Sequence, residues 1–447
     1  MPAGPTAGTG CATFLAHCFP DSLSIAPSDA GGQHSRLAAV TIIATSRDTR
    51  PPRNALRAMH SKPHHQIMRT LLFAALTLLG ADAAFAQQDP KPKVKPAFQY
   101  KTDDIEVSIP TADEPKVAAF NADTIKAAGK YLEDGALSWV RGKACINCHT
   151  TGPYMSERPA LTMLPGKPSE EVLANFVNAI PDKPSAETEK EGLKYFPGSW
   201  TVIWCSLGLA EWDRHVTGKL SEHTDRSLRQ MMLRQSPSGA FVSYGEVEVP
   251  HITTDFELTL QAARAITAAP GWLAGLKDAD LLARIDRMKA WLRDATPRND
   301  FDRVLRLQLA SYMPELVPQA DRDAALALLS QKQHADGGWS LRDMSPVNDW
   351  HFQMSDTVLK VIASLPDAAN PDSDPYMTAL AIVLMKQSGI ATSDERIQRG
   401  VAWLKREQRI SGRWWMHSLY RGNYYYITYI ATAEAMKALA LCGELGG

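Results

Sequence analysis

Gln408-Arg-Ile-Ser-Gly412-Arg-Trp414 decides the fold, because the chain repeats its pattern. Gln333-His-Ala-Asp-Gly337-Gly338-Trp339 has the same spacing, and Gln235-Ser-Pro-Ser-Gly239-Ala-Phe241 keeps the glutamine, the glycine and an aromatic residue in register. Thr296-Pro-Arg-Asn-Asp300-Phe301 is a degenerate fourth copy, which Trp291 precedes as Trp403 precedes the last copy. Glycine can end a helix in the left-handed conformation, and glutamine can bond the backbone groups that the helix end frees. Because apolar residues with helical spacing flank each copy, the repeat unit is predicted to be helix, loop, helix.

The same helical spacing extends over most of 118–447, in segments separated by loops rich in Gly, Pro, Asn and Asp. No convincing pair of strands is found, so the sequence predicts an all-α protein. The glutamine loops resemble the QW motif of the squalene-hopene cyclase and prenyltransferase superfamily. That resemblance implies an α/α toroid over 118–447, in which an inner ring of helices surrounds a central cavity and an outer ring covers it. The motif is specific for this fold and says little about chemistry.

The first 86 residues have no sustained helical or strand period. Within them, Met68-Arg69-Thr70, an apolar run over 71–79 and Ala84-Phe85-Ala86 form the pattern of a secretory signal peptide. We therefore expect 1–67 to be a disordered, non-native upstream extension and 68–86 to be the signal peptide. Residues 87–117 are expected to form an extended lead-in. The mature protein is predicted to be periplasmic or secreted, from a bacterium, with no integral membrane segment.

Charge and cysteine content exclude several classes of protein. Without the seven basic and four acidic residues of 1–86, the chain has 41 Lys and Arg and 45 Asp and Glu. This balance gives no electrostatic footprint for nucleic acid or for an anionic membrane. Cys145, Cys148, Cys205 and Cys442 are too few and too scattered for a disulfide framework.

Cys145-Ile-Asn-Cys148-His149 has the pattern of a c-type haem attachment site. Two thiols at this spacing can meet the two vinyl groups, and the imidazole that follows can bind the iron. We predict that Cys145, Cys148 and His149 bind haem c, with His149 as an iron ligand. Matching Trp139 to Trp403 places the motif at the loop of the first repeat, between an outer helix over 131–141 and an inner helix over 199–215. A redox disulfide and half of a zinc site are the alternatives.

A second axial ligand would decide between electron transfer and binding of a small ligand. Met163 is the first choice and Met155 the second. The histidine alternatives are His215, His223, His251, His334, His351 and His417.

The acidic Asp-x-Asp-Asp motif that a class II terpene cyclase needs is absent, as is the Asp-rich metal motif of diphosphate-using synthases. Asp372-Ser-Asp374 precedes a proline and is predicted to cap a helix. A tyrosine-rich segment before the last helix is expected to pack helix ends, with cation stabilisation as the alternative. Its residues are Tyr420, Tyr424, Tyr425, Tyr426 and Tyr429, next to Trp414 and Trp415. The acids of a deviant enzyme would be Asp255, Asp349 and Asp356.

These patterns together predict an exported haem c-binding protein that transfers electrons to a redox partner protein or senses a small ligand. The alternative is a cyclase-like enzyme that acts on an apolar or polyisoprenoid substrate in the central cavity. A platform for a glycan or a partner protein is a third hypothesis.

Overall fold

The computed structural model describes residues 98–164, 166–181, 199–242, 254–349, 360, 362–417 and 425–446. The predicted upstream extension, the signal peptide and the first part of the lead-in lie outside the described residues. Residues from Pro96 to Gly447 belong to one compact unit. None of the helices in the described part of the chain is both long enough and apolar enough to cross a membrane.

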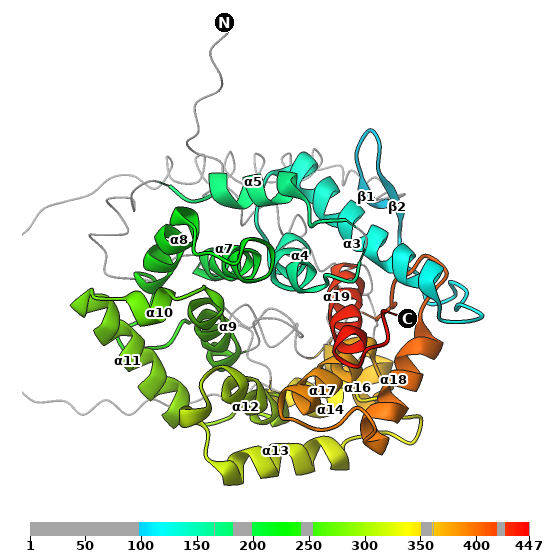
Figure 1. The fold of residues 1–447 in the computed structure, drawn as a ribbon. Coiled ribbons are helices and arrows are strands. Elements are labelled where there is room, and N and C mark those ends of the chain that lie inside the picture. The colour runs from blue at the N-terminus through cyan, green and yellow to red at the C-terminus, as the bar shows by residue number, and fades with distance from the viewer. Residues whose placement is uncertain are drawn as a thin grey trace, which may run out of the picture. The chain divides into compact units, whose positions relative to one another are not determined.

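The longer helices lie in two concentric rings (Figure 1). The inner ring consists of α4 (Thr151–Glu157), α7 (Ser199–Trp212), α9 (Asp255–Ala268), α12 (Asp300–Tyr312), α17 (Pro375–Gln387) and α19 (Tyr426–Leu441). The outer ring consists of α3 (Ala122–Lys143), α5 (Glu170–Asn178), α8 (Glu222–Met232), α11 (Ala279–Asp294), α13 (Gln319–Gln331) and α18 (Glu395–Glu407). The predicted all-α class and α/α toroid are therefore confirmed.

Short elements fill the turns between the rings. They are α10 (Trp272–Gly275), α14 (Leu341–Met344), α16 (Pro366–Ala369), the 3-10 turns η1 (Arg158–Ala160), η3 (Pro314–Leu316) and η4 (Val347–Asp349), and the π-helical turn η2 (Asp213–Thr217).

Burial separates the two kinds of helix. Every residue of 375–385 in α17 is buried, because an inner helix is covered by neighbours and by the outer ring. The outer helix α18 buries only the face that carries Ile397, Val401 and Leu404 and exposes its charged face. A helix that buries only one face carries its apolar residues along that face, which gives this amphipathic pattern.

The three glutamine loops share one set of hydrogen bonds, which explains their repeated spacing. In each loop the glutamine Nε2 donates to the carbonyl of the glycine four residues on and to a carbonyl of the next outer helix. The acceptor pairs are Gly239 and Arg284 for Gln235, Gly337 and Arg396 for Gln333, and Gly412 and Thr124 for Gln408, all at 2.9–3.0 Å. Because Thr124 lies in α3, the first outer helix, the last of these bonds closes the ring.

The glycine of each loop is required by both conformation and space. Gly412 has φ of 89°, and a Cβ built on it would lie 2.3 Å from backbone atoms of Ala127 and Ala128 in α3. The aromatic residue that follows is a core residue: Trp414 is fully buried, and its Nε1 donates to the Leu404 carbonyl at 2.7 Å.

Two predictions are wrong, one about strands in the lead-in and one about the inner helix of the first repeat. The lead-in contains an antiparallel strand pair, β1 (Phe98–Lys101) and β2 (Glu106–Ser108), whose length is too short to give a clear alternation. The inner helix that follows the Cys145–His149 motif is α4, and not the predicted helix over 199–215. Its seven residues include Gly152 and Pro153, so it shows no helical period in the sequence.

Candidate functional site

The haem-type motif lies in the loop between an outer and an inner helix. The outer helix α3 ends at Ala144, which adopts the left-handed conformation with φ of 49°. Asn147 then fixes the loop, because its Oδ1 accepts hydrogen bonds from the backbone N–H groups of His149 at 3.0 Å, Thr150 at 2.6 Å and Thr151 at 3.2 Å. The Asn147 side chain is buried, so the loop that carries both cysteines is tied to the start of α4.

Two aromatic side chains and a hydroxyl surround the predicted iron ligand. The His149 ring lies edge-on to Trp139, at 4.8 Å between centroids, and 4.9 Å from the Tyr426 ring. Its Nδ1 is 3.1 Å from Thr150 Oγ1. Trp139 Nε1 also donates to Cys145 Sγ at 3.1 Å. Sequence reasoning assigned neither Thr150 nor Tyr426 to the motif. Tyr426 could not be found from the sequence, because it comes from the opposite end of the chain.

The donor set fits a c-type haem. Cys145 and Cys148 are both half-buried free cysteines of this loop. A histidine whose Nδ1 is held by a hydrogen bond binds a metal through Nε2, with its ring orientation fixed. The Nδ1 contact of His149 with Thr150 matches this arrangement.

The predicted second axial ligands are scattered. Met163 is 42% exposed in a turn after η1, whereas Met155 is fully buried in α4. The histidine alternatives have other neighbours: His215 lies beside Glu211, His223 beside Arg226, His334 beside Asp343, and His417 beside Trp415. His251 and His351 lie outside the described residues.

The zinc alternative has no support in the described part of the chain, where no group of three His, Cys, Asp or Glu side chains is placed to hold a metal ion. Burial raises the pKa of Cys205 to about 12. Burial also raises the pKa of Cys442. A thiol must lose its proton to bind zinc, so the buried environments of Cys205 and Cys442 both oppose zinc binding.

A second candidate site is the small cavity at the centre of the inner ring, with a volume of about 30 Å³ accessible to water. All the inner helices α4, α7, α9, α12, α17 and α19 contribute to its wall. The wall combines charged, polar and apolar side chains. Glu157, Glu257, Arg264, Glu434 and Lys437 are charged, Ser156, Gln261, Gln308 and Tyr376 are polar, and Pro153, Trp204, Leu305, Leu380, Ile430 and Ala433 are mainly apolar.

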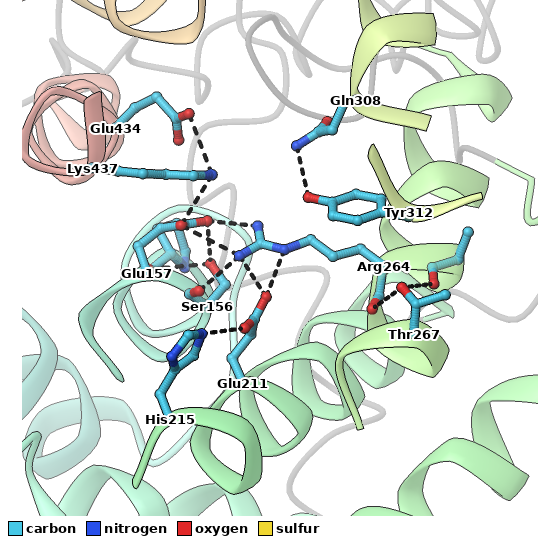
Figure 2. A network of polar contacts seen from close by, with 12 residues as sticks. Ser156, Glu157, Glu211, His215, Arg264, Thr267, Gln308, Tyr312, Glu434 and Lys437 are labelled. Carbon is cyan, nitrogen blue, oxygen red and sulfur yellow. Dashed lines mark hydrogen bonds and ion pairs between the residues drawn. The ribbon is translucent and has the colours of Figure 1, made fainter. Parts of the chain in front are cut away.

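The charged side chains form a buried network that joins four inner helices (Figure 2). The Arg264 guanidinium lies 2.6 Å from Glu157 Oε1 and 2.7 Å from Glu211 Oε1, and it also donates to the Ser156 carbonyl at 2.9 Å. Lys437 Nζ lies 3.1 Å from Glu157 Oε2 and 3.5 Å from Glu434 Oε1. Arg264 therefore fastens α4 and α7 to α9, and Lys437 fastens α19 to α4.

The network sets the pKa values of its carboxyl groups apart. Burial raises the pKa of Glu211, but Arg264 and His215 outweigh it and hold the pKa at about 2. Burial likewise opposes ionisation of Glu157. The charges of Arg264 and Lys437 outweigh burial and keep the pKa of Glu157 below its usual value. For Glu434 burial prevails, and with the neighbouring Glu157 it raises the pKa above the usual value despite Lys437.

Sequence reasoning missed this network, although a signal was present. Arg264 is the one cation of α9, and Glu434 and Lys437 are the charged residues of the otherwise mainly apolar α19, where an unpaired charge would be very costly. The acids that the sequence suggested are elsewhere: Asp255 begins α9 and Asp349 ends η4, and neither is among the described residues that line the cavity. Asp356 lies outside the described residues.

Two further predictions concern helix ends. Asp374 is the N-cap of α17, and its carboxylate accepts from Met377 N–H at 2.7 Å, as predicted. In the tyrosine-rich segment, Tyr429 is fully buried against Tyr100 and Tyr131, which confirms a packing role for that residue. Tyr420 and Tyr424 lie outside the described residues.

No protein family model matches the chain. No curated protein matches it either. Among solved structures, it is similar to a protein from Actinoplanes, with 14% identity over 72% of this chain and 99% of that chain and a TM-score of 0.43. It is also similar to the type II terpene cyclase MstE from Scytonema, with 13% identity over 72% and 98% of the two chains and a TM-score of 0.39.

An MstE variant in complex with its substrate, geranylgeranyl dihydroxybenzoate, has 13% identity over 72% of this chain and 97% of that chain, with a TM-score of 0.40. A similar ring of helices does not imply a similar activity.

Proposed function

We propose that this chain is an exported haem c-binding protein, in which Cys145 and Cys148 form thioethers with the porphyrin and His149 binds its iron. The observation that carries the proposal is the loop geometry: the two sulfur atoms and the imidazole lie on one short loop that Asn147 fixes through three backbone hydrogen bonds. A loop already held in shape binds its group with less loss of conformational freedom.

The surrounding side chains have distinct roles in this proposal. Thr150 orients the His149 ring through Nδ1, and Trp139 holds Cys145 through its indole N–H. Trp139 and Tyr426 provide an aromatic environment around the imidazole. A bound haem c would supply one-electron redox chemistry or a site for a small ligand.

Expression in a host that matures cytochromes c tests the proposal. The exported protein is expected to be coloured, with a mass above that of the bare polypeptide and with absorption spectra that change on reduction. The double variant Cys145→Ser/Cys148→Ser is expected to lose the covalent haem, whereas the control Cys205→Ala, in the buried face of α7, is expected to keep it. Met163→Leu and Met155→Leu then test the sixth ligand by its spectrum. A colourless wild-type protein with the mass of the bare chain would contradict the proposal.

A second candidate function is that of a cyclase-like enzyme for a polyisoprenoid substrate. The observation that favours it is the central cavity, where Trp204, Tyr376 and Leu380 supply aromatic and aliphatic surface beside the charged network. Incubation with squalene and with geranylgeranyl dihydroxybenzoate, followed by mass spectrometry of the products, tests this function. Recovery of both compounds unchanged would rule against it.

A further inference from the structure

The N-terminal strand β1, which contacts the outer helix α3, contains a β-bulge. Its residues Phe98 and Tyr100 pair with the consecutive residues 108 and 107 of β2, so Gln99 is an extra residue of β1 in this ladder. Side chains normally alternate between the two faces of a strand, whereas a bulge changes the direction of a side chain locally. The bulge therefore allows Gln99 and Tyr100 to face the same helices.

The Tyr100 side chain is enclosed between α3 and α19. Tyr100 is only 6% exposed, and its ring lies edge-on to Tyr429 of α19 at 5.8 Å between centroids. A Cβ built on Gly135 of α3 would lie 2.4 Å from Tyr429 Cε2 and 3.1 Å from Tyr100 Cε2. Glycine at this position thus lets both rings approach the helix, and packing fixes the place of the Tyr100 hydroxyl.

The Tyr100 hydroxyl reaches the predicted iron ligand through a single residue. It lies 3.1 Å from Oγ1 of the fully buried Thr150, and this Oγ1 lies 3.1 Å from His149 Nδ1. A hydroxyl oxygen has two acceptor lone pairs. Whichever hydroxyl donates in the bond between Tyr100 and Thr150, Thr150 therefore keeps a lone pair for an N–H at Nδ1 of His149. A histidine that carries its proton on Nδ1 has Nε2 free to bind a metal.

Gln99 anchors the same strand on the other side of the histidine. Its Nε2 donates to the Tyr425 carbonyl at 3.0 Å, and its Oε1 accepts from Tyr131 Oη of α3 at 2.9 Å. Tyr425 directly precedes Tyr426, whose ring lies 4.9 Å from the His149 ring. Two consecutive residues of β1 thus hold the groups on both sides of His149.

We infer that Tyr100 is a positioning residue of the haem site, which fixes the Thr150 hydroxyl and, through it, the tautomer and the ring orientation of His149. The inference rests on the proposed function, because that function makes His149 the iron ligand. Burial raises the pKa of Tyr100 well above its usual value, so the phenol stays protonated and neutral at physiological pH. The lead-in, which sequence reasoning treated only as an extended segment, is thus part of the site.

NMR spectroscopy of the full-length protein with nitrogen-15-labelled histidine tests the inference without haem, in protein from a host that does not mature cytochromes. At about pH 9 a histidine ring is ordinarily neutral, and its two nitrogen shifts report which nitrogen carries the proton. The wild type is expected to show one His149 tautomer, with the proton on Nδ1. Tyr100→Phe is expected to show a mixture of both tautomers, because the Thr150 hydroxyl can then turn away. Loss of signals in His149→Gln identifies the ring.

Redox titration of the haem-loaded protein is the second measurement. Tyr100→Phe is expected to raise the midpoint potential by a smaller shift than Thr150→Val, since the bond at His149 Nδ1 is loosened and not removed. In the Thr150→Val background, Tyr100→Phe is expected to cause no further shift, because both residues act through one chain of contacts.

Tyr429→Phe is the matched control. It removes a hydroxyl from a tyrosine of the same buried cluster, but this hydroxyl donates to the Leu132 carbonyl and not to the haem-type loop. The control is expected to keep the wild-type tautomer and potential, even where it lowers the thermal stability. A purely structural role of Tyr100 would make the two variants alike.

A second variant keeps the inference testable if Tyr100→Phe fails to fold. Gln99→Leu removes the bonds of β1 to Tyr425 and Tyr131, and it is expected to give a mixture of His149 tautomers as well.

The two proposals fail in different ways. A wild-type protein that never acquires haem would contradict the proposed function, and the tautomers of the haem-free protein would still decide the role of Tyr100. That role is overturned if the wild type already shows both His149 tautomers, or if Tyr100→Phe keeps the wild-type tautomer and potential. Equal changes in Tyr100→Phe and Tyr429→Phe would also overturn it.

Discussion

Replacement of Arg264 by methionine tests the central network most directly. The change removes the guanidinium but keeps much of the side-chain volume, so Glu157 and Glu211 stay buried without their main cation. Glu211 has a pKa of about 2 against an ordinary value of 4.5, a difference that corresponds to about 3 kcal/mol of stability at neutral pH. Removing one partner from a buried ion pair costs about 3–5 kcal/mol, so Arg264→Met is expected to lower the free energy of unfolding by that amount.

The pH dependence of this loss has a definite sign. In the wild type the folded pKa of Glu211 is depressed, so its contribution is present above pH 4.5 and is lost as pH falls from 4.5 towards 2. In Arg264→Met only His215 opposes the effect of burial on Glu211, so the folded pKa of Glu211 is expected to rise. Protonation then relieves the penalty, so the variant is expected to become more stable as pH falls from neutrality.

Urea denaturation followed by circular dichroism, between pH 7 and pH 3, measures both effects. The control is Arg293→Met, which removes a surface ion pair with Asp294 in which both side chains are more than half exposed. Its cost is expected to be at most about 1 kcal/mol. Equal stabilities of the two variants, or parallel pH slopes for Arg264→Met and the wild type, would refute this account of the network.

Three further predictions concern the loops. Gly412→Ala places a Cβ 2.3 Å from the backbone of α3 at a φ of 89° and is expected to lower the free energy of unfolding by more than about 1 kcal/mol. Gly142→Ala, in a helix with open space around it, is expected to raise the free energy of unfolding by about 0.5–1 kcal/mol. Urea denaturation measures both shifts, and equal shifts for the two variants would contradict this account. Gln408→Leu loses the bonds to Gly412 and Thr124 and is expected to cost about 1–3 kcal/mol, with faster amide exchange in α3 as the sign of an opened ring. Thr150→Val removes the partner of His149 Nδ1 and is expected to raise the midpoint potential of the haem-loaded protein, because that bond makes the imidazole a stronger donor to iron; an unchanged potential in a redox titration would argue against this role.

The loops were predictable because their constraints are local. Gln408, Gly412 and Trp414 meet the needs of one helix end, so their spacing in the sequence is the spacing that the loop requires. The first repeat was predicted less well. Its inner helix α4 has seven residues, and a helix that short cannot display the apolar period from which a helix is recognised.

The sequence by itself determined the class of fold, the position of the Cys145–His149 motif at a loop of the first repeat, and the helix cap at Asp374. Only the tertiary structure decided that Tyr426 lies against His149 and that Glu157, Arg264 and Lys437 meet in one cavity. The physical reason is separation along the chain: these partners are more than 100 residues apart in every case, and no local pattern encodes which inner helices face one another. Closure of the ring, to which the bond from Gln408 to Thr124 contributes, brings α19 with Tyr426 and Lys437 beside α3 and α4.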